Sequence, residues 1–287
     1  MRILLLGKYG QLGWELARAL PPLGEVIAAD YPEIDLGKPD QVRAIVRESA
    51  ANVIINATAY TAVDKAESER DLAFAINATG PGVLAEEAKA RGASLIHYST
   101  DYVFDGEKGG PYVETDAPNP LGAYGASKLA GEQAVQAAGG AHLILRTAWV
   151  YSLRQGGFVN KVLEWSRKQE TLRVVDDQVS NPTWARMLAE ITAQMLAGGQ
   201  DCVEAHTGLY HLGGGGYTSR YDWAREILRL DPRREEQITS QVLPARTSDF
   251  PTTARRPLFS ALNCDRFTSV FGLQLPRWDT SLALAMG

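Results

Sequence analysis

The chain has 287 residues, of which 45% are hydrophobic and 22% are charged, and its formal net charge is −5. This composition is ordinary for a soluble globular protein, and the acidic balance argues against a general affinity for nucleic acid or for an anionic membrane surface. The apolar run near the N-terminus ends at Gly7, which is too short for a signal peptide or a membrane span, so we expect a cytoplasmic protein.

The mostly apolar residues 2–6 predict a central parallel strand, and glycines follow at positions 7, 10 and 13. Residues 14–20 have helical character and stop at Pro21. Glycines with this spacing between a strand and a helix let the backbone approach a pyrophosphate, whose charge suits the free amides of the helix N-terminus. Gly7, Gly10 and Gly13 therefore predict a dinucleotide-binding loop.

A second predicted strand, residues 25–29, ends at Asp30, about 20 residues after the glycine loop. An acid at this point typically accepts a hydrogen bond from the adenosine ribose. Its carboxylate would repel a 2′-phosphate, which favours NADH slightly over NADPH, although Lys8, Arg18 or Arg43 could compensate.

Two further predicted strands, 52–57 and 94–99, end in polar segments. The first exit, residues 57–61, is small and hydroxylic, as suits backbone beside a cofactor. Thr100 follows the second strand and is placed to donate to a substrate carbonyl, because catalytic groups in open α/β sheets lie at the carboxyl ends of strands. His97, inside that strand, is interpreted as a packed core histidine.

Tyr124 and Lys128 lie four residues apart at the start of a predicted helix, so their side chains share one face. A nearby ammonium favours the ionised form of a phenol, which brings its proton closer to transfer at neutral pH. Packing of the tyrosine beside a solvated lysine is the alternative. The glycine loop and Thr100 upstream favour the catalytic interpretation.

After residue 150 the regular alternation of strands and helices loosens. Short strands are predicted at 172–175 and 209–212, and helices at 158–168, 184–197, 221–230, 265–271 and 278–286. We therefore predict an α/β fold: a Rossmann-type doubly wound parallel sheet in residues 1–150 and a smaller, mixed α/β C-terminal substrate-binding part in residues 151–287. The two parts are expected to be intimately packed, with possible chain crossovers.

In this order, the glycine loop, Ser99-Thr100-Asp101-Tyr102 and the Tyr-Lys pair resemble the extended short-chain dehydrogenase/reductase family. Within it the chain resembles the dTDP-4-dehydrorhamnose reductases. The stretches that carry this resemblance are GKYGQLGWEL (7–16), NATAYTAVDKAESE (56–69), IHYSTDYVFDG (96–106), YGASKLAGE (124–132), RTAWVY (146–151), VDDQVSNPT (175–183), GLYHL (208–212) and SDFPTTARRPLFSALN (248–263). The resemblance implies reduction of the C4 ketone of dTDP-4-dehydro-6-deoxy-L-mannose to dTDP-L-rhamnose with NADPH or NADH.

The same resemblance implies a role for individual residues. Tyr124 would be the proton donor, Lys128 would bind the nicotinamide ribose, and Thr100 would hold the substrate carbonyl. The implied cofactor-binding residues are Gly7, Gly10, Gln11, Leu12, Gly13, Asp30, Asp35, Leu36, Ala59, Tyr60, Thr61, Tyr98, Tyr124 and Lys128. The implied substrate-binding residues are Thr100, Asp101, Trp149, Lys161 and Arg256. Tyr9 departs from the small residue common in such loops.

Two alternatives stay open: a reductase or epimerase of another nucleotide sugar, and a non-catalytic regulatory subunit related to the methionine adenosyltransferase β subunit. The expected partner is a dTDP-sugar substrate, with no nucleic acid or membrane, and the protein is expected to be a monomer or a homodimer. No metal is expected. Glu15 and Glu190 are interpreted as surface glutamates, and the two cysteines have no metal-ligand spacing.

Overall fold

The computed structural model describes residues 1–154 and 156–287. At its centre is a six-stranded parallel sheet with the strand order β10-β5-β4-β3-β1-β2. Its strands are β1 (Arg2–Leu6), β2 (Glu25–Ala29), β3 (Val53–Asn56), β4 (Ser94–Thr100), β5 (His142–Thr147) and β10 (Gly208–His211). The order of the strands reverses between β1 and β3. Ligands of open parallel sheets bind at the carboxyl edge of such a switch point.

The sheet forms because its inner strands are apolar on both faces. Residues 3–6 of β1 and all of β3 are buried, as expected for strands covered by helices on both sides. β2 lies at the edge and is only half-buried along most of its length. The continuous apolar runs in the sequence therefore mark the centre of the sheet, as predicted.

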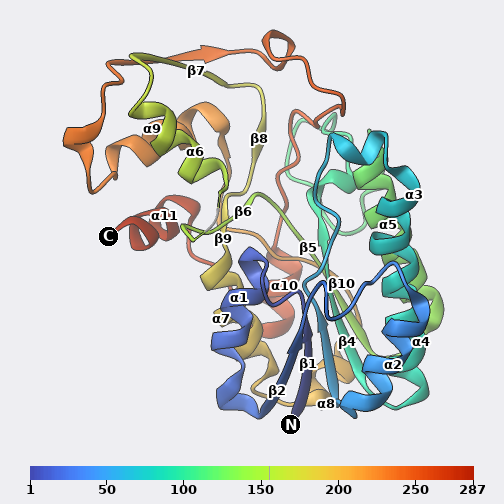
Figure 1. The fold of residues 1–287 in the computed structure, drawn as a ribbon. Helices are drawn as coiled ribbons and strands as arrows, with labels where there is room; N and C mark the ends of the chain where they lie inside the picture. The colour runs from blue at the N-terminus through green and yellow to red at the C-terminus, as the bar shows by residue number, and fades with distance from the viewer. Residues whose placement is uncertain (155) are drawn as a thin grey trace.

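Helices cover both faces of the sheet (Figure 1). One layer contains α1 (Gln11–Ala19), α7 (Ala185–Leu196), α8 (Gln200–Ala205) and α10 (Asp265–Phe271). The other contains α2 (Pro39–Ser49), α3 (Arg70–Phe74), α4 (Gly80–Ala90) and α5 (Ala123–Ala138). The predicted Rossmann-type fold class is confirmed. Helix α1 begins three residues before the predicted start, so Gly13 lies inside it.

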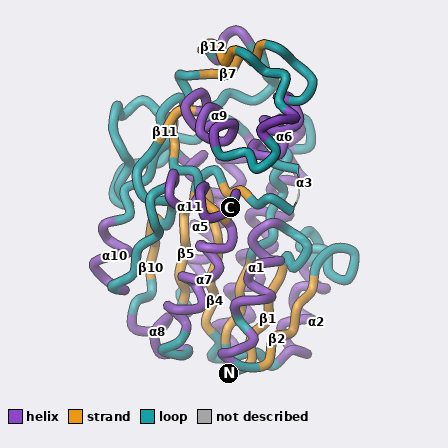
Figure 2. Tube along the Cα trace, turned by 90° about the vertical axis from the view of Figure 1, so that its left-hand side faces the viewer, coloured by secondary structure: helices purple, strands orange, loops and turns teal. Residues whose placement is uncertain are grey.

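Above the carboxyl edge lies a smaller group of elements with its own hydrophobic core around Trp223 (Figures 1 and 2). Its helices are α6 (Phe158–Ser166), α9 (Arg220–Arg229) and α11 (Trp278–Met286). Its strands form pairs: β6 (Val150–Tyr151) with β9 (Thr183–Trp184), β7 (Thr171–Val175) with β12 (Gln241–Ala245), and β8 (Val179–Ser180) with β11 (Thr218–Ser219). Strand β12 is not among the predicted elements.

Short turns of helix complete the described chain. They are η1 (Pro21–Leu23), η2 (Lys65–Glu67), η4 (Asp101–Val103), η5 (Arg234–Glu236) and η6 (Thr247–Asp249), together with the π-helical turn η3 (Ala75–Thr79). None of the helices in residues 1–154 and 156–287 is long and apolar enough to cross a membrane.

The chain crosses between the two parts more than once. Strand β10 returns to the large sheet beside β5, and α7 packs against α1. A large part of residues 151–287 therefore belongs to the core of the first part. The elements above the edge are built from the remaining segments of these residues.

Candidate active site

A cavity of about 440 Å³ lies where the glycine loop, the exit of β3 and the ends of β4 and β5 meet. It brings together most of the predicted site residues. Its lining consists of Gly7, Gly10, Gln11, Leu12, Asp30, Ala57, Thr58, Ala59, Thr61, Tyr98, Ser99, Thr100, Asp101, Tyr124, Lys128, Thr147, Trp149 and Val150.

The glycine loop is closed against its neighbours so tightly that side chains do not fit. Gly7 has φ +94°, and a Cβ there would lie 2.8 Å from the carbonyl carbon of Ala57. A Cβ on Gly13 would lie 1.8 Å from the carbonyl oxygen of Gly7. The loop therefore leads directly into α1, and Gly10, the N-cap residue of this helix, provides no side-chain cap. The first amides of α1 are left for an anion in the cavity.

Three polar atoms in this cavity are buried without a hydrogen-bond partner: Gln11 Oε1, Thr58 Oγ1 and Thr147 Oγ1. Buried polar atoms are nearly always paired, because an unmade hydrogen bond there costs about 1–3 kcal/mol. These atoms come from α1 and from the ends of β3 and β5 and lie along the cavity. The residues present thus fit an elongated polar ligand such as a nicotinamide dinucleotide.

Asp30 lies at the end of β2, on the adenosine side of the expected dinucleotide. Its carboxylate accepts hydrogen bonds from the backbone amides of Tyr9 and Tyr31, both at 2.8 Å. Arg43, Arg18 and Lys8 are the cations that could offset the repulsion between Asp30 and a 2′-phosphate. Arg43 pairs with glutamates of α4, and Arg18 stacks on an indole ring. Lys8 is also engaged, by a glutamate at 2.6 Å.

Tyr124 and Lys128 project from the first two turns of α5 into the same cavity. Lys128 is buried, and its Nζ donates to the backbone oxygen of Tyr98 at 2.7 Å. Tyr124 is half-buried, with the ring of Tyr102 edge-on at 5.7 Å between centroids. The helical spacing therefore brings the pair together as the sequence predicts.

The expected lowering of the tyrosine pKa is not found. Burial raises the pKa of Tyr124, and a hydrogen bond with Thr100 offsets this only in part. Burial also lowers the pKa of Lys128 to about 8, so its ammonium is itself destabilised. Desolvation is the largest effect on the pKa of both groups, and the phenol stays protonated at neutral pH.

Thr100 and Asp101 connect the end of β4 to the upper elements. The Thr100 hydroxyl accepts from the amide of Tyr102 and donates to Asp101 Oδ1, each at 3.1 Å. Asp101 Oδ2 accepts from Ser180 at 3.1 Å and from Ser260. Burial raises the pKa of Asp101 to about 6 despite these donors. In this arrangement the hydroxyl hydrogen of Thr100 is directed at a carboxylate, so donation to a substrate requires the hydroxyl to turn.

Trp149 lines the cavity and is held in an unusual backbone conformation, with φ +42°. Its ring stacks on that of Trp223, with 5.6 Å between centroids and 13° between planes. The Arg220 guanidinium lies 3.6 Å from the centroid of the same ring. The indole is therefore held by two side chains of α9.

Arg220 is a charged group that the sequence predictions miss. No hydrogen bond or ion pair of its side chain occurs within the described residues, and burial lowers its pKa to about 10. The charges of Asp101 and Arg256 affect this pKa, so these groups are close enough to interact. No local motif reveals it, because Trp149 and Asp101 lie far away in the sequence.

Four predicted cofactor residues lie outside the lining: Gly13, Leu36, Tyr60 and Asp35. Gly13 is packed inside α1, and the side chain of Leu36 is buried in the core against α2 and α4. Tyr60 donates its hydroxyl to Glu69, and Asp35 accepts from the amide of Gly37 at 2.9 Å. Any contact of Leu36 with a cofactor would have to come from its backbone.

Two predicted substrate-binding residues, Lys161 and Arg256, also lie outside the lining. Lys161 is exposed on α6. Arg256 pairs with Asp64 at 2.7 Å. The sequence gives no sign of this ion pair, because its partners are 192 residues apart.

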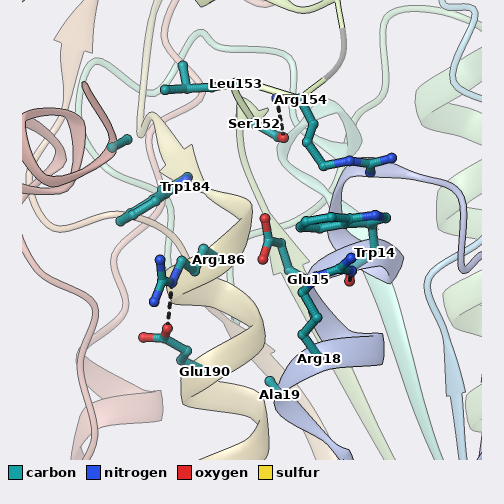
Figure 3. A pocket seen from close by; sticks show the side chains of 11 residues that line it. Trp14, Glu15, Arg18, Ala19, Ser152, Leu153, Arg154, Trp184, Arg186 and Glu190 are labelled. Carbon is teal, nitrogen blue, oxygen red and sulfur yellow. Dashed lines mark hydrogen bonds and ion pairs between the residues drawn. The ribbon is translucent and has the colours of Figure 1, made fainter. Parts of the chain in front are cut away.

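A second cavity, of about 530 Å³, lies between α1 and α7 and contains none of the predicted site residues (Figure 3). Figure 3 shows Arg154 above the ring of Trp14 and Arg18 below it. Glu15 lines this cavity, and Glu190 accepts from its neighbour Arg186 at 2.8 Å. Within the described residues no group of three or more His, Cys, Asp or Glu side chains could hold a metal ion.

A dinucleotide-type loop that shares its cavity with a Tyr-Lys pair, below a C-terminal extension, defines an extended short-chain dehydrogenase/reductase. Within this class the chain belongs to the dTDP-4-dehydrorhamnose reductase family. The family model described as the RmlD substrate binding domain matches residues 1–286. The dTDP-4-dehydrorhamnose reductase of Burkholderia thailandensis is 42% identical, over 100% of this chain and 98% of that protein. The predicted family and the prediction of an oxidoreductase are confirmed.

Solved structures agree with this assignment. A dTDP-4-dehydrorhamnose reductase from Clostridium acetobutylicum superposes with a TM-score of 0.92 at 38% identity, covering 100% of this chain and 98% of that one. The enzyme from Bacillus anthracis, solved in complex with NADP, gives 0.89 at 34% identity, covering 98% and 96%. The expected cofactor class therefore agrees with that of a solved relative.

Proposed function

We propose that the protein reduces the C4 ketone of dTDP-4-dehydro-6-deoxy-L-mannose to dTDP-L-rhamnose with NADPH or NADH. The observation that carries this proposal is that Tyr124, Lys128 and Thr100 line one cavity with the glycine loop. The names of the relatives support the substrate. The bound dinucleotide supplies the hydride, and the acid of Asp30 favours NADH slightly.

Tyr124 is the proton donor in this proposal. An alkoxide is a stronger base than a phenolate, so a phenol that stays protonated can still transfer its proton as negative charge develops on the ketone oxygen. Burial, which raises the pKa of Tyr124, keeps that proton in place before the reaction. Hydrogen bonds from Tyr124 and Thr100 to this oxygen strengthen as the charge grows, which lowers the barrier.

Lys128 orients the nicotinamide ribose from the floor of the cavity. Its Nζ is fixed by one hydrogen bond to the Tyr98 carbonyl, which leaves further N–H groups for the ribose hydroxyls. The first amides of α1 bind the pyrophosphate. These contacts would hold the cofactor in the cavity that Tyr124 lines, and positioning of this kind can supply much of the rate enhancement in bimolecular reactions.

Residues 151–287, in this proposal, provide the binding site for the nucleotide sugar. Trp149 and Asp101 contact the sugar, and Arg220 and Arg256 neutralise the diphosphate. Arg220 is the stronger candidate, since among residues 1–154 and 156–287 its guanidinium has no acidic hydrogen-bond partner, while Arg256 already pairs with Asp64. A desolvated cation held flat against an indole is well prepared to bind phosphate oxygens.

The direct test is oxidation of NADPH and of NADH, followed by the loss of absorbance of the reduced ring, with the dTDP-4-keto sugar generated in situ from dTDP-glucose. We expect oxidation only with the complete set of upstream enzymes, and dTDP-L-rhamnose as the product. Cofactor binding without oxidation would refute the substrate. Tightly retained NAD⁺ in the purified protein would then indicate an epimerase, and co-purification with a second subunit a regulatory role.

A further inference from the structure

His97 is a fully buried histidine that the proposed chemistry does not use. It lies in the middle of β4, one residue before the carbonyl that binds Lys128, and its side chain is 0% exposed. Burial and the charge of Lys128 keep its pKa well below the ordinary value. The ring is therefore neutral and carries a single hydrogen, on either Nδ1 or Nε2.

Asn56, at the end of β3, decides which nitrogen carries the hydrogen. Its Oδ1 accepts from the backbone amide of Thr58 at 3.1 Å, which fixes the orientation of the amide group. Its Nδ2 consequently faces His97 Nδ1 at 3.1 Å. An amide nitrogen can only donate, so Nδ1 accepts and the hydrogen of the ring is on Nε2.

The hydrogen on Nε2 points towards the catalytic lysine. His97 Nε2 is 3.5 Å from Lys128 Nζ. An ammonium has only hydrogens to present and opposes this N–H, whereas a neutral amine has a lone pair that can accept it. The other fixed contact of Nζ, to the Tyr98 carbonyl at 2.7 Å, needs a single N–H and is compatible with either state.

We propose that His97, oriented by Asn56, is a positioning residue that favours the neutral amine of Lys128. The role deepens the proposed function and rests on it, because the charge of Lys128 stabilises the phenolate left after proton transfer. As pH rises and that charge is lost, turnover falls. His97 thereby sets the pH at which the alkaline limb of the activity profile begins.

The other groups around Lys128 act differently. Glu132, one turn further along α5, raises the lysine pKa, but its carboxylate is itself paired with Arg146 at 2.6 Å. Tyr124 on the same helix is a neutral phenol. On the substrate side lie Asp101, whose pKa burial raises to about 6, and Tyr102, whose pKa is also raised. Burial lowers the lysine pKa to about 8, and among these neighbours it is His97 whose N–H faces the ammonium.

The first test is the tautomer of His97 in the wild-type protein, read from ¹⁵N chemical shifts of labelled histidine. We expect the hydrogen on Nε2. A hydrogen on Nδ1 overturns the proposal. This measurement needs neither substrate nor a variant, so it stands even if the sugar substrate proves to be a different one.

The second test is the pKa of Lys128, measured by NMR with ¹³C-labelled lysine, together with the pH profile of kcat/KM. In His97→Gln the amide can turn its oxygen towards Nζ, and we expect the lysine pKa and the alkaline limb to rise together by about one pH unit. In Asn56→Asp the carboxylate accepts a hydrogen bond from His97 Nδ1–H, which leaves Nε2 as an acceptor for Lys128 Nζ. The lysine pKa and the alkaline limb should therefore rise in this variant as well.

A matched control separates this role from general effects of substitution. His142 is the buried histidine of the neighbouring strand β5, and its Nδ1 bonds a backbone oxygen of its own turn. His142→Gln should leave the pKa of Lys128 unchanged. An unchanged lysine pKa in folded His97→Gln overturns the proposal, and so does an equal shift in the control.

Discussion

The two sides of the candidate site are built in different ways. On the sheet side, Thr100, Tyr124 and Lys128 come from the end of one strand and from the helix that follows it, all within a few tens of residues. On the upper side, Trp149 and Arg220 are 71 residues apart in the sequence, and the Arg220 guanidinium lies over the indole ring. In the proposed function, the chemistry thus lies on one strand end and one helix, while recognition of the substrate depends on segments that are distant in the sequence.

Asp101 joins the two sides. It follows β4 directly, yet its carboxylate is held by Ser180 and Ser260, both from the second half of the chain. Burial of such a group costs stability, since its pKa is raised rather than lowered. The contact between the two sides therefore lowers the stability of the fold at pH values at which Asp101 is ionised.

If the sheet side carries the chemistry, Tyr124→Phe gives the largest effect. We expect kcat to fall about 10²–10⁴-fold, because the general acid is lost, while the dissociation constant of the dinucleotide changes little. Steady-state kinetics and fluorescence titration with NADH measure the two quantities. Retained kcat with a large rise in the dissociation constant would show that the tyrosine only binds cofactor.

The rigidity of the sheet side should depend on the buried pair of Glu132 and Arg146, whose side chains are 2% and 4% exposed. In Glu132→Gln the buried guanidinium loses its counter-charge, and we expect the free energy of unfolding to fall by about 3–5 kcal/mol. Urea unfolding measures it. The exposed pair of Arg186 and Glu190 is the control, and Glu190→Gln should cost less than about 1 kcal/mol. Equal losses would contradict the difference in burial.

The contact between the two sides is tested by the pH dependence of the free energy of unfolding in Asp101→Asn. The wild-type pKa is raised from 3.8 to about 6, so the contribution of Asp101 is fully present below about pH 4 and is lost as pH rises through 6. Relative to wild type, the variant should gain about 3 kcal/mol between pH 4 and pH 8.

Urea unfolding at several pH values provides this comparison, and Asp64→Asn is its control. Arg256 lowers the pKa of Asp64, so stability from that carboxylate is present at higher pH and is lost on acidification. The control variant should therefore lose stability relative to wild type as pH rises, whereas Asp101→Asn should gain it. If the difference in the free energy of unfolding between Asp101→Asn and wild type does not change with pH, Asp101 is not desolvated in solution.

The smallest effect is expected on the upper side, in Arg220→Gln. Loss of charge-assisted hydrogen bonds to a diphosphate should raise KM for the nucleotide sugar about 10–100-fold, with cofactor affinity unchanged. In Arg220→Lys, KM for the nucleotide sugar should lie between the values of wild type and Arg220→Gln. The lysine keeps the charge but not the planar group that stacks on Trp149. A fall in kcat with unchanged KM would move Arg220 from substrate binding to support of the indole.

Local patterns were enough to predict the sheet side. The apolar runs of β1 and β3 could only be central strands, and β2 and α10 have the predicted bounds. The glycines lie within one turn, and Tyr124 and Lys128 lie within one helix. Their spacing in the sequence therefore fixes their relative positions in space. Leu36 lies outside such patterns, and its side chain lies in the core and not in the cavity.

The sequence by itself determined the α/β class, the position of the glycine loop and the shared helix face of Tyr124 and Lys128, because each depends on residues close together along the chain. Tertiary structure decided the rest: the return of β10 to the sheet, the ion pair of Arg256, and the stacking of Arg220 on Trp149. It also decided the direction of the pKa shifts of Tyr124 and Lys128, since desolvation depends on everything packed around a group and not on its neighbours in sequence.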